Sequence, residues 1–170
     1  SGQFSWLPSY NQSGTHTTTF MATSKGKTAS EDVNIHVNNV NRAPELGEIG
    51  DQIIDENKEL LFPIPASDPD GDPLVFTADG ELSKYLDQEN RYFNWTPDHN
   101  DAGNYTITFK VADETKSDSK TINITVGNVD RPPVLETIGD KIVKEDNLLN
   151  FTVNASDPDG NETELRTTEL

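Results

Sequence analysis

Apolar and polar residues alternate one by one along several stretches of this chain. The pattern is clearest in residues 104–111 and recurs in residues 121–126 and 150–155. A period of two places successive side chains on opposite faces of a β-strand. Each predicted strand therefore has one buried and one solvated face, which is typical of antiparallel sandwiches and not of parallel α/β sheets.

The chain also repeats itself at an offset of 89 residues. Residues 4–20 (FSWLPSYNQSGTHTTTF) align without a gap with residues 93–109 (FNWTPDHNDAGNYTITF). The hexapeptide ASDPDG occurs at 66–71 and again at 155–160. The ungapped overlap contains 31 identities in 81 positions, which indicates tandem modules.

One complete module of 89 residues is predicted at 43–131. Residues 1–42 then correspond to the C-terminal half of a preceding module, and residues 132–170 to the N-terminal half of a following one. Neither half can bury its apolar face alone, and unpaired strand edges recruit partners. We expect the C-terminal half of one molecule to pair with the N-terminal half of the next, a head-to-tail contact that propagates as a fibre. The alternative is a fragment of a longer polypeptide whose covalent neighbours supply the missing strands.

Turn-forming residues divide each repeat into about seven short strands, which fits an immunoglobulin-like sandwich. Trp95, beside Phe93, is predicted to be its central core residue. Tyr105 follows the pattern of a tyrosine corner, in which the phenol hydroxyl bonds to upstream backbone. His16 occupies the same position in the first copy, so we expect that corner to be lost there. Residues 81–90 show neither the strand period of two nor the helical period of about 3.6. We expect a short helical turn or an irregular crossover there.

Composition narrows the function classes. A formal net charge of −17 argues against nucleic-acid binding, which needs clustered Lys and Arg, and is compatible with cation binding or with a solvated surface. The absence of cysteine excludes disulfides and thiol catalysis. No apolar run is long enough for a transmembrane segment. His16, His36 and His99 have no metal-ligand spacing and accompany no nucleophile motif, so the chain is not expected to be an enzyme.

Four segments carry a family resemblance: NRAPEL with IGDQIIDEN, ASDPDGDPL, FNWTP with DAGNYTITFKVAD, and NVDRPP. They resemble the cadherin-like and dystroglycan-type modules, related to Ig-type and PKD-type repeats, of microbial cell-surface proteins. The resemblance implies an all-β fold of immunoglobulin-like (cadherin-like) antiparallel β-sandwich repeats. It also implies an extracellular, cell-surface location.

The resemblance further implies Ca²⁺ at module junctions. The ligands that it assigns at the junction after the complete module are Glu56, Asn128, Asp130, Asp157 and Asp159. The junction before that module offers Asp68 and Asp70 with Asn39 and Asn41, and we expect it to be the poorer site. Arg131 departs from the pattern, because the cadherin linker is more acidic there. The residues themselves leave an alternative open, since Asp-Pro-Asp-Gly is also the sequence that a type I turn selects without any metal.

Asn-x-Ser/Thr sequons are frequent, and each is a candidate glycosylation site. They lie at Asn11, Asn94, Asn104, Asn123, Asn150, Asn154 and Asn161. The alternative is a solvated β face rich in Thr and Asn, in which the strand period itself generates the motif.

Taken together, the sequence predicts a non-enzymatic structural or adhesive repeat module of an extracellular surface protein or filament, stiffened by Ca²⁺ at its junctions. Its expected partners are neighbouring copies of the same repeat and surface glycans. The alternative function is that of a carbohydrate- or cell-wall-binding accessory module of a secreted polysaccharide-degrading enzyme.

Overall fold

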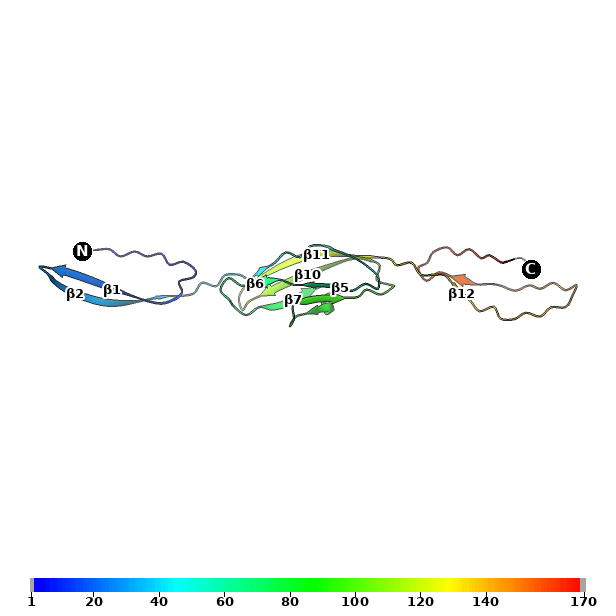
Figure 1. The fold of residues 1–170 in the computed structure, drawn as a ribbon, viewed down its shortest axis with the longest axis horizontal. Helices are drawn as coiled ribbons and strands as arrows, with labels where there is room; N and C mark the ends of the chain where they lie inside the picture. Colours follow the sequence, from blue (N-terminus) through cyan, green and yellow to red (C-terminus); the bar gives the residue numbers. More distant parts are fainter. Residues whose placement is uncertain (1, 169–170) are drawn as a thin grey trace. The chain divides into compact units, whose positions relative to one another are not determined.

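The computed structural model describes residues 2–168; residues 1, 169 and 170, the outermost positions of the two predicted half-modules, lie outside the described residues. Nearly all its elements are strands (Figure 1). In chain order they are β1 (Gly14–Ser24), β2 (Lys27–Val37), β3 (Glu45–Leu46), β4 (Gln52–Asp55), β5 (Leu60–Pro63), β6 (Ala66–Ser67), β7 (Val75–Asp79), the 3₁₀ helix η1 (Ser83–Tyr85), β8 (Leu86–Asp87), β9 (Tyr92–Trp95), β10 (Gly103–Ala112), β11 (Ser117–Gly127), β12 (Val134–Leu135) and β13 (Ala155–Ser156).

The structure has two compact units. The first contains the chain up to Glu48 with Pro65–Thr77 and Phe109–Lys120, and the second contains Ile49–Ile64, Ala78–Thr108 and the chain from Thr121 onward. The first unit includes a long antiparallel hairpin of β1 and β2, in which Ser24 pairs with Lys27. The two residues between them, Lys25 and Gly26, have φ of 48° and 78°, as a type I′ turn requires.

The strands between residues 43 and 131 form sheets of two, three and four strands. The four-stranded sheet has the order β4-β11-β10-β7, the three-stranded sheet β5-β9-β8, and β3 pairs with β6. In the second unit, Trp95 of β9 lies edge-on to Tyr105 of β10, with ring centroids 5.1 Å apart. This contact brings the inner faces of the two larger sheets together across an aromatic core, as in a sandwich.

Burial follows the predicted alternation. Trp95 is 2% exposed and Phe93 is fully buried, which confirms both as core residues. The apolar positions of β10 and β11 are also at most 4% exposed: Ile107, Phe109, Val111, Ile122, Ile124 and Val126. The helical turn expected within residues 81–90 is confirmed by η1.

The tyrosine corner is confirmed, and the expectation for His16 was wrong. The Tyr105 hydroxyl donates to the Asp101 carbonyl oxygen at 2.8 Å. His16 Nε2 lies 2.9 Å from the Gln12 carbonyl oxygen. Because that oxygen can only accept, the imidazole donates from Nε2 and replaces the phenol. The first copy therefore keeps its corner with a different residue.

The strand predicted over residues 150–155 forms only at its last position, where β13 begins. Residues 149–152 occupy the place of β5 in the repeat and residues 3–6 the place of β9, yet neither segment is a strand. In the complete copy, β5 and β9 exist as partners of one another, with Leu60 opposite Trp95 and Phe62 opposite Phe93. By contrast β12 and β13, which lie in one half, pair in the same register as β3 and β6. A strand thus forms where its own partner is present.

Within the described residues, no helix is long and apolar enough to cross a membrane.

Trp95→Ala should destabilise the segment 43–131 by about 3–5 kcal/mol, because the substitution removes a buried large aromatic side chain and leaves a cavity. The measurement is urea unfolding followed by circular dichroism. As the control, Ile53→Ala removes a side chain that is 82% exposed and should change stability by no more than about 0.5 kcal/mol. An unchanged midpoint for Trp95→Ala would show that this indole does not hold the core together.

Candidate functional site

The two Asp-Pro-Asp-Gly segments form tight turns. The Gly71 amide donates to the Asp68 carbonyl oxygen at 3.2 Å, and Gly71 has φ of 79°. Asp68 Oδ1 accepts the amides of Asp70 and Asp72 at 2.7 and 3.1 Å. The second turn repeats this arrangement, with Gly160 bonded to Asp157 at 3.1 Å. The chain's own hydrogen bonds are thus sufficient to build the turn.

An arginine at the end of each linker binds the turn that follows. The first linker is residues 39–42 (NVNR) and the second is residues 128–131 (NVDR). We call the region where a linker meets the next Asp-Pro-Asp-Gly turn a junction. At the first junction the Arg42 amide donates to Asp70 Oδ2 at 2.7 Å. The Arg42 guanidinium donates to Asp70 Oδ1 from Nε at 3.0 Å and from a terminal nitrogen at 2.7 Å. The same terminal nitrogen reaches the Pro69 carbonyl oxygen at 2.5 Å. We call this set of bonds the Arg–Asp clamp.

The same clamp recurs 89 residues later. Arg131 donates to Asp159 from its amide at 2.6 Å and from Nε at 2.9 Å, and its terminal nitrogen reaches the Pro158 carbonyl oxygen at 2.8 Å. Sequence reasoning treated Arg131 only as a departure from an acidic linker. The available signal was that this arginine and its aspartate are identical in both copies.

The clamp changes the acidity of its members. Hydrogen bonds from Arg42 lower the pKa of Asp70, and those from Arg131 lower the pKa of Asp159. Asp72 behaves in the opposite way, because burial and then the negative charge of Asp68 raise its pKa. The first junction therefore contains one neutralised carboxylate beside another that lacks a cationic partner.

Unpartnered oxygens distinguish the first junction. Carboxylate oxygens of Asp68, Asp70 and Asp72 lie within 4.8 Å of one another. Asp68 Oδ2 and Asn41 Oδ1 are both buried and have no hydrogen-bond partner. Buried oxygens normally have a partner, so each of these two oxygens is open to a water molecule or a cation.

A small acidic pocket adjoins these oxygens. Its volume is about 270 Å³, and its lining residues are Asn39, Asn41, Asp72, Pro73, Asp113, Glu114 and Thr115. The Asn41 amide nitrogen donates to Asp113 Oδ2 at 3.0 Å and to Thr115 Oγ1 at 2.7 Å. These bonds fix the side chain, so that Asn41 presents its carbonyl oxygen as an acceptor. Sequence reasoning missed Asp72 and Asp113.

The second junction also gathers three predicted ligands. Carboxylate oxygens of Asp130, Asp157 and Asp159 lie within 4.8 Å of one another. Asp130 Oδ1 accepts the Asn161 side-chain amide at 2.8 Å. Because Arg131 already binds both oxygens of Asp159, a cation would have to compete with the clamp at this site.

Glu56 has a different position from the other predicted ligands. Its side chain is buried, with 1% exposure, and lies outside both carboxylate clusters of the described chain. Oε1 accepts the Ala102 amide at 3.1 Å and Oε2 accepts the Val129 amide at 2.8 Å. Glu56 thus anchors the start of the second linker through its backbone. Asn128, the remaining predicted ligand, is exposed.

All seven sequon asparagines are exposed to solvent. Several of them bond to neighbouring side chains; for example, Asn94 donates to Glu59 at 3.1 Å and Asn154 to Glu136 at 2.9 Å.

Solved structures that match the chain include cadherin repeats, immunoglobulin domains and glycoside hydrolases. The first two cadherin repeats of human protocadherin-24 are 19% identical to the chain, with 70% of this chain and 61% of that chain covered and a TM-score of 0.45. Sidekick-1 immunoglobulin domains 1–5 are 18% identical, with coverage of 71% and 26% and a TM-score of 0.43. An endo-fucoidan hydrolase of glycoside hydrolase family 107 is 22% identical, with coverage of 72% and 20% and a TM-score of 0.42. The chain therefore spans about a fifth of that enzyme's length.

No curated protein sequence matches the chain. Residues 41–125 match the sequence model of the bacterial Ig domain family. That segment begins in the first linker and includes the buried strands of the complete repeat, so the predicted immunoglobulin-like fold is confirmed. The chain belongs to the bacterial Ig domain family.

Proposed function

We propose that this chain is a non-catalytic structural and adhesive repeat of an extracellular surface protein or filament. The observation that carries the proposal is the recurrence of the Arg–Asp clamp at both linkers. At each one, the backbone amide and the guanidinium of a single arginine are bonded to the turn that follows. A linker held in this way has little freedom to rotate, which suits modules that transmit length and force in series.

The charge of the chain agrees with a role outside the cell. A net charge of −17 keeps a protein soluble and discourages non-specific association. The seven exposed sequons offer attachment points for glycans if the chain passes through a glycosylating compartment. Neighbouring repeats and surface glycans are the partners that we infer.

Calcium at the junctions is the second part of the proposal. Ca²⁺ takes six to eight oxygen ligands, of which carboxylates, amide carbonyls and waters are the usual donors. The first junction offers the unpartnered oxygens of Asp68 and Asn41 beside the carboxylate of Asp72. The donor chemistry therefore fits Ca²⁺, which would tie the linker to the turn in addition to the clamp.

The second junction fits a cation less freely. Asp130 and Asp157 lack an arginine partner, but Asp159 is neutralised by Arg131. We infer that Ca²⁺ binds the first junction more tightly than the second, because the second site must give up part of its clamp.

Millimolar Ca²⁺ should raise the melting temperature of the full chain relative to EDTA. A ligand that binds only the folded state stabilises it by about 2.7 kcal/mol at a hundredfold excess over Kd. Asp68→Asn combined with Asp72→Asn should remove most of the gain, and Asp157→Asn combined with Asp159→Asn the remainder. Differential scanning calorimetry provides the measurement.

Asp79→Asn serves as the matched control for this experiment. It removes the same charge from an exposed carboxylate outside both clusters, and the response to Ca²⁺ should be retained. If wild-type protein melts at the same temperature in Ca²⁺ and in EDTA, the Asp-Pro-Asp-Gly segments are turns only and the calcium proposal fails.

The clamp makes a separate prediction about pH. Asp70 and Asp159 should titrate below the ordinary value of 3.8, because each carboxylate is stabilised by its arginine. Since the unfolded state then binds more protons in acid, the clamps stabilise the fold fully above about pH 4 and are lost as pH falls through the lowered pKa. Carboxyl carbon shifts in an NMR titration measure both values.

Arg131→Gln should return the pKa of Asp159 toward 3.8 and leave Asp70 unchanged. Arg166→Gln removes an exposed guanidinium that bonds only Glu164 in the described chain, and it should alter neither. A normal pKa for Asp159 in the wild-type protein would show that the clamp does not persist in solution.

A further inference from the structure

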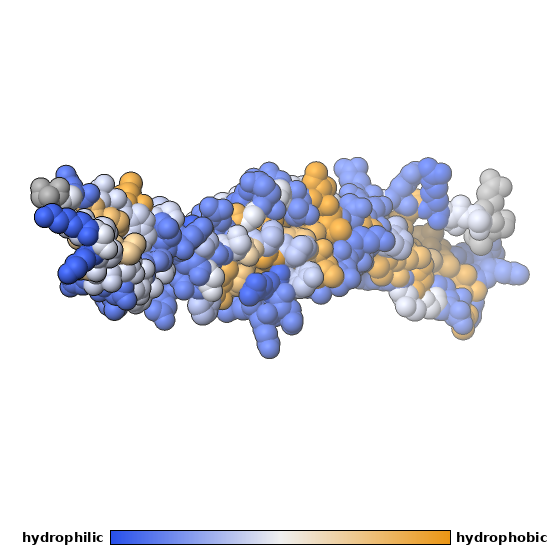
Figure 2. Space-filling view, turned by 60° about the vertical axis from the view of Figure 1, so that its left-hand side comes forward, coloured by the Kyte–Doolittle hydropathy of each residue, from blue (hydrophilic) through white to orange (hydrophobic). Residues whose placement is uncertain are grey.

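Residues 132–168 expose an apolar face that is buried in the complete copy. The counterpart of a residue is defined as the residue 89 positions away in the aligned copy. Leu149 is 43% exposed, whereas its counterpart Leu60 is 7% exposed. Leu135 is 56% exposed, and Ile138 is half-buried although its counterpart Ile49 is buried. The space-filling view shows apolar surface gathered in this C-terminal part of the chain (Figure 2).

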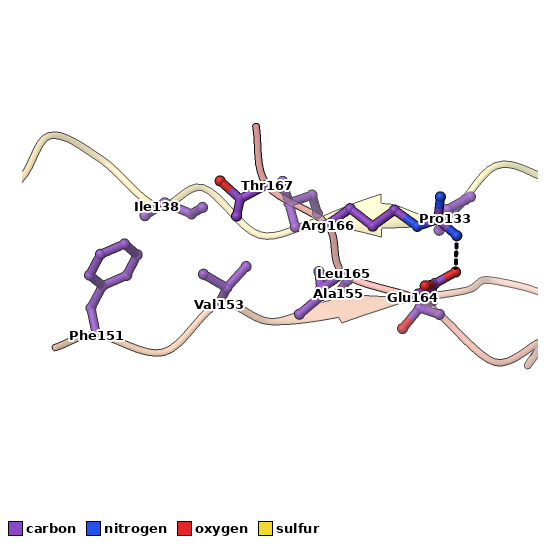
Figure 3. Close-up of a pocket in the computed structure, with 11 residues that line it drawn as sticks. Pro133, Ile138, Phe151, Val153, Ala155, Glu164, Leu165, Arg166 and Thr167 are labelled. Carbon is purple, nitrogen blue, oxygen red and sulfur yellow. Dashed lines mark hydrogen bonds and ion pairs between the residues drawn. The ribbon is translucent and has the colours of Figure 1, made fainter. Parts of the chain in front are cut away.

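The exposed face forms a groove of about 660 Å³. Figure 3 shows Phe151, Val153 and Ala155 in a row along one segment, with Ile138 on the segment opposite. Leu165, the counterpart of buried Phe76, also lines the groove and is 52% exposed.

In the complete copy, β5 pairs with β9 within one sheet, and β4 pairs with β11 within the other. Leu60 lies opposite Trp95 and Phe62 opposite Phe93, whose rings stack with centroids 5.1 Å apart. In the four-stranded sheet, Ile54 of β4 pairs in parallel with Val126 of β11. Any occupant of the groove must therefore supply one antiparallel and one parallel strand.

Residues 2–42 contain the counterparts of both strands, residues 3–6 for β9 and β2 for β11, and have their own uncovered face. Phe4 is 54% exposed, whereas its counterpart Phe93 is fully buried, and Phe20 is 42% exposed. The apolar residues that would fill the groove are identical to their counterparts at five positions: Phe4, Trp6, Phe20, Ile35 and Val37.

The Trp6 ring within residues 2–42 already has the arrangement of its counterpart in the complete core. Trp6 lies edge-on to His16, with centroids 5.0 Å apart and planes at 78°. The counterpart pair, Trp95 and Tyr105, has values of 5.1 Å and 80°. The indole is thus already oriented as it is in the complete core.

We infer that the apolar face of residues 132–168 is a docking surface for residues 2–42 of a second copy of this chain. This inference rests on the proposed function and names the partner that such a repeat binds. In the docked state Leu149 lies opposite Trp6, Asn150 opposite Ser5 and Phe151 opposite Phe4, the register of β5 on β9. Val143 pairs in parallel with Val37, the register of β4 on β11.

The polar groups fit the same arrangement. Glu56 is buried and accepts the Val129 amide at 2.8 Å. Its counterpart Glu145 is exposed, and the counterpart of Val129 is Val40. Docking brings the Val40 amide to Glu145 and gives this carboxylate the partner that Glu56 already has.

The contact is heterologous, because one copy gives its N-terminal segment and the other its C-terminal face. Each chain has both surfaces, so the contact either propagates along a filament or closes as a reciprocal dimer. Both forms contain the same docked register.

Cysteine cross-linking tests the register, because the chain has no cysteine of its own. One full-length chain carries Ser5→Cys and a second, mass-labelled chain carries Asn150→Cys, both at exposed positions. Directly opposed residues in antiparallel strands have Cβ atoms about 4.5–5.5 Å apart, close to disulfide geometry. With oxidised glutathione as the oxidant, the mixed disulfide dimer should form in high yield.

Asn154→Cys is the off-register control. It is exposed and lies on the same side of the segment as Asn150, but four residues further along. Its yield with Ser5→Cys should be at least about tenfold lower, since four residues in a strand span about 13 Å. Equal yields from the two pairs would overturn the proposed register.

The second test compares two adjacent leucines. Leu149→Asp alters a residue that the docked register places opposite Trp6, whereas Leu148, 90% exposed, has an exposed counterpart in Glu59 and stays outside the docked surface. Light scattering of the wild-type chain should show mass rising with concentration. Leu149→Asp should raise the dissociation constant by at least about tenfold, a change of about 1.4 kcal/mol, and Leu148→Asp should leave it unchanged.

A wild-type chain that stays monomeric at the highest concentration reached would overturn the docking inference. Equal effects of the two leucine substitutions would also overturn it, because association would then be non-specific. Either result leaves the proposed function testable, since the Ca²⁺ response and the titration of Asp159 report on the junctions and do not require association.

Discussion

A sheet with one apolar face needs a second layer to cover it, and the rest of this structure follows from whether that layer is present. Between residues 43 and 131 the layer is present, and the inward-facing side chains of β9, β10 and β11 are almost completely buried. In the outer segments the same residue types recur in the same pattern but remain exposed or only half-buried. Full burial of one such side chain contributes about 1.5–3 kcal/mol, so several uncovered positions leave a considerable driving force unused.

At the junctions, hydrogen bonds hold a short linker in place without a large apolar contact. Arg42 and Arg131 do so with a planar guanidinium that binds a carboxylate through two nitrogens while the backbone amide binds the other oxygen. Arginine suits this geometry better than lysine, because its rigid planar guanidinium presents several N–H donors at once, here to one carboxylate oxygen and to the neighbouring proline carbonyl oxygen. The arginine also neutralises one acidic group, which makes the remaining free oxygens decide how well each junction accommodates a cation.

Much of the fold was predictable from local pattern. The period of two identified the buried faces of β10 and β11, and the flanking aromatic residue identified Trp95 as core. The lack of a strand at residues 149–152 was not predictable from their own sequence. A strand there depends on a partner far away in the chain or in another molecule. The repeat offset supplied the necessary comparison with Leu60–Pro63, where that partner exists.

The candidate sites were only half accessible to sequence reasoning. Asp68, Asp70, Asp157 and Asp159 were found because the Asp-Pro-Asp-Gly motif is short and local. The roles of Asp72 and Asp113 depend on which side chains converge after folding, and His16 substitutes for a tyrosine through a hydrogen bond that no residue-type comparison indicates. Glu56 resembles a metal ligand in sequence, yet its two oxygens bind backbone amides.

Amide hydrogen exchange of the counterpart segments tests most directly whether strand formation depends on a partner. At a dilution where the chain is monomeric, the β5 amides that bond to β9 should exchange slowly, with protection close to that of the global fold. Their counterparts within residues 149–151 have nearly the same sequence environment but no ladder, and they should exchange at close to unprotected rates. Equal protection of the two sets of amides in the monomer would contradict the account, because strand formation would then not depend on the partner strand.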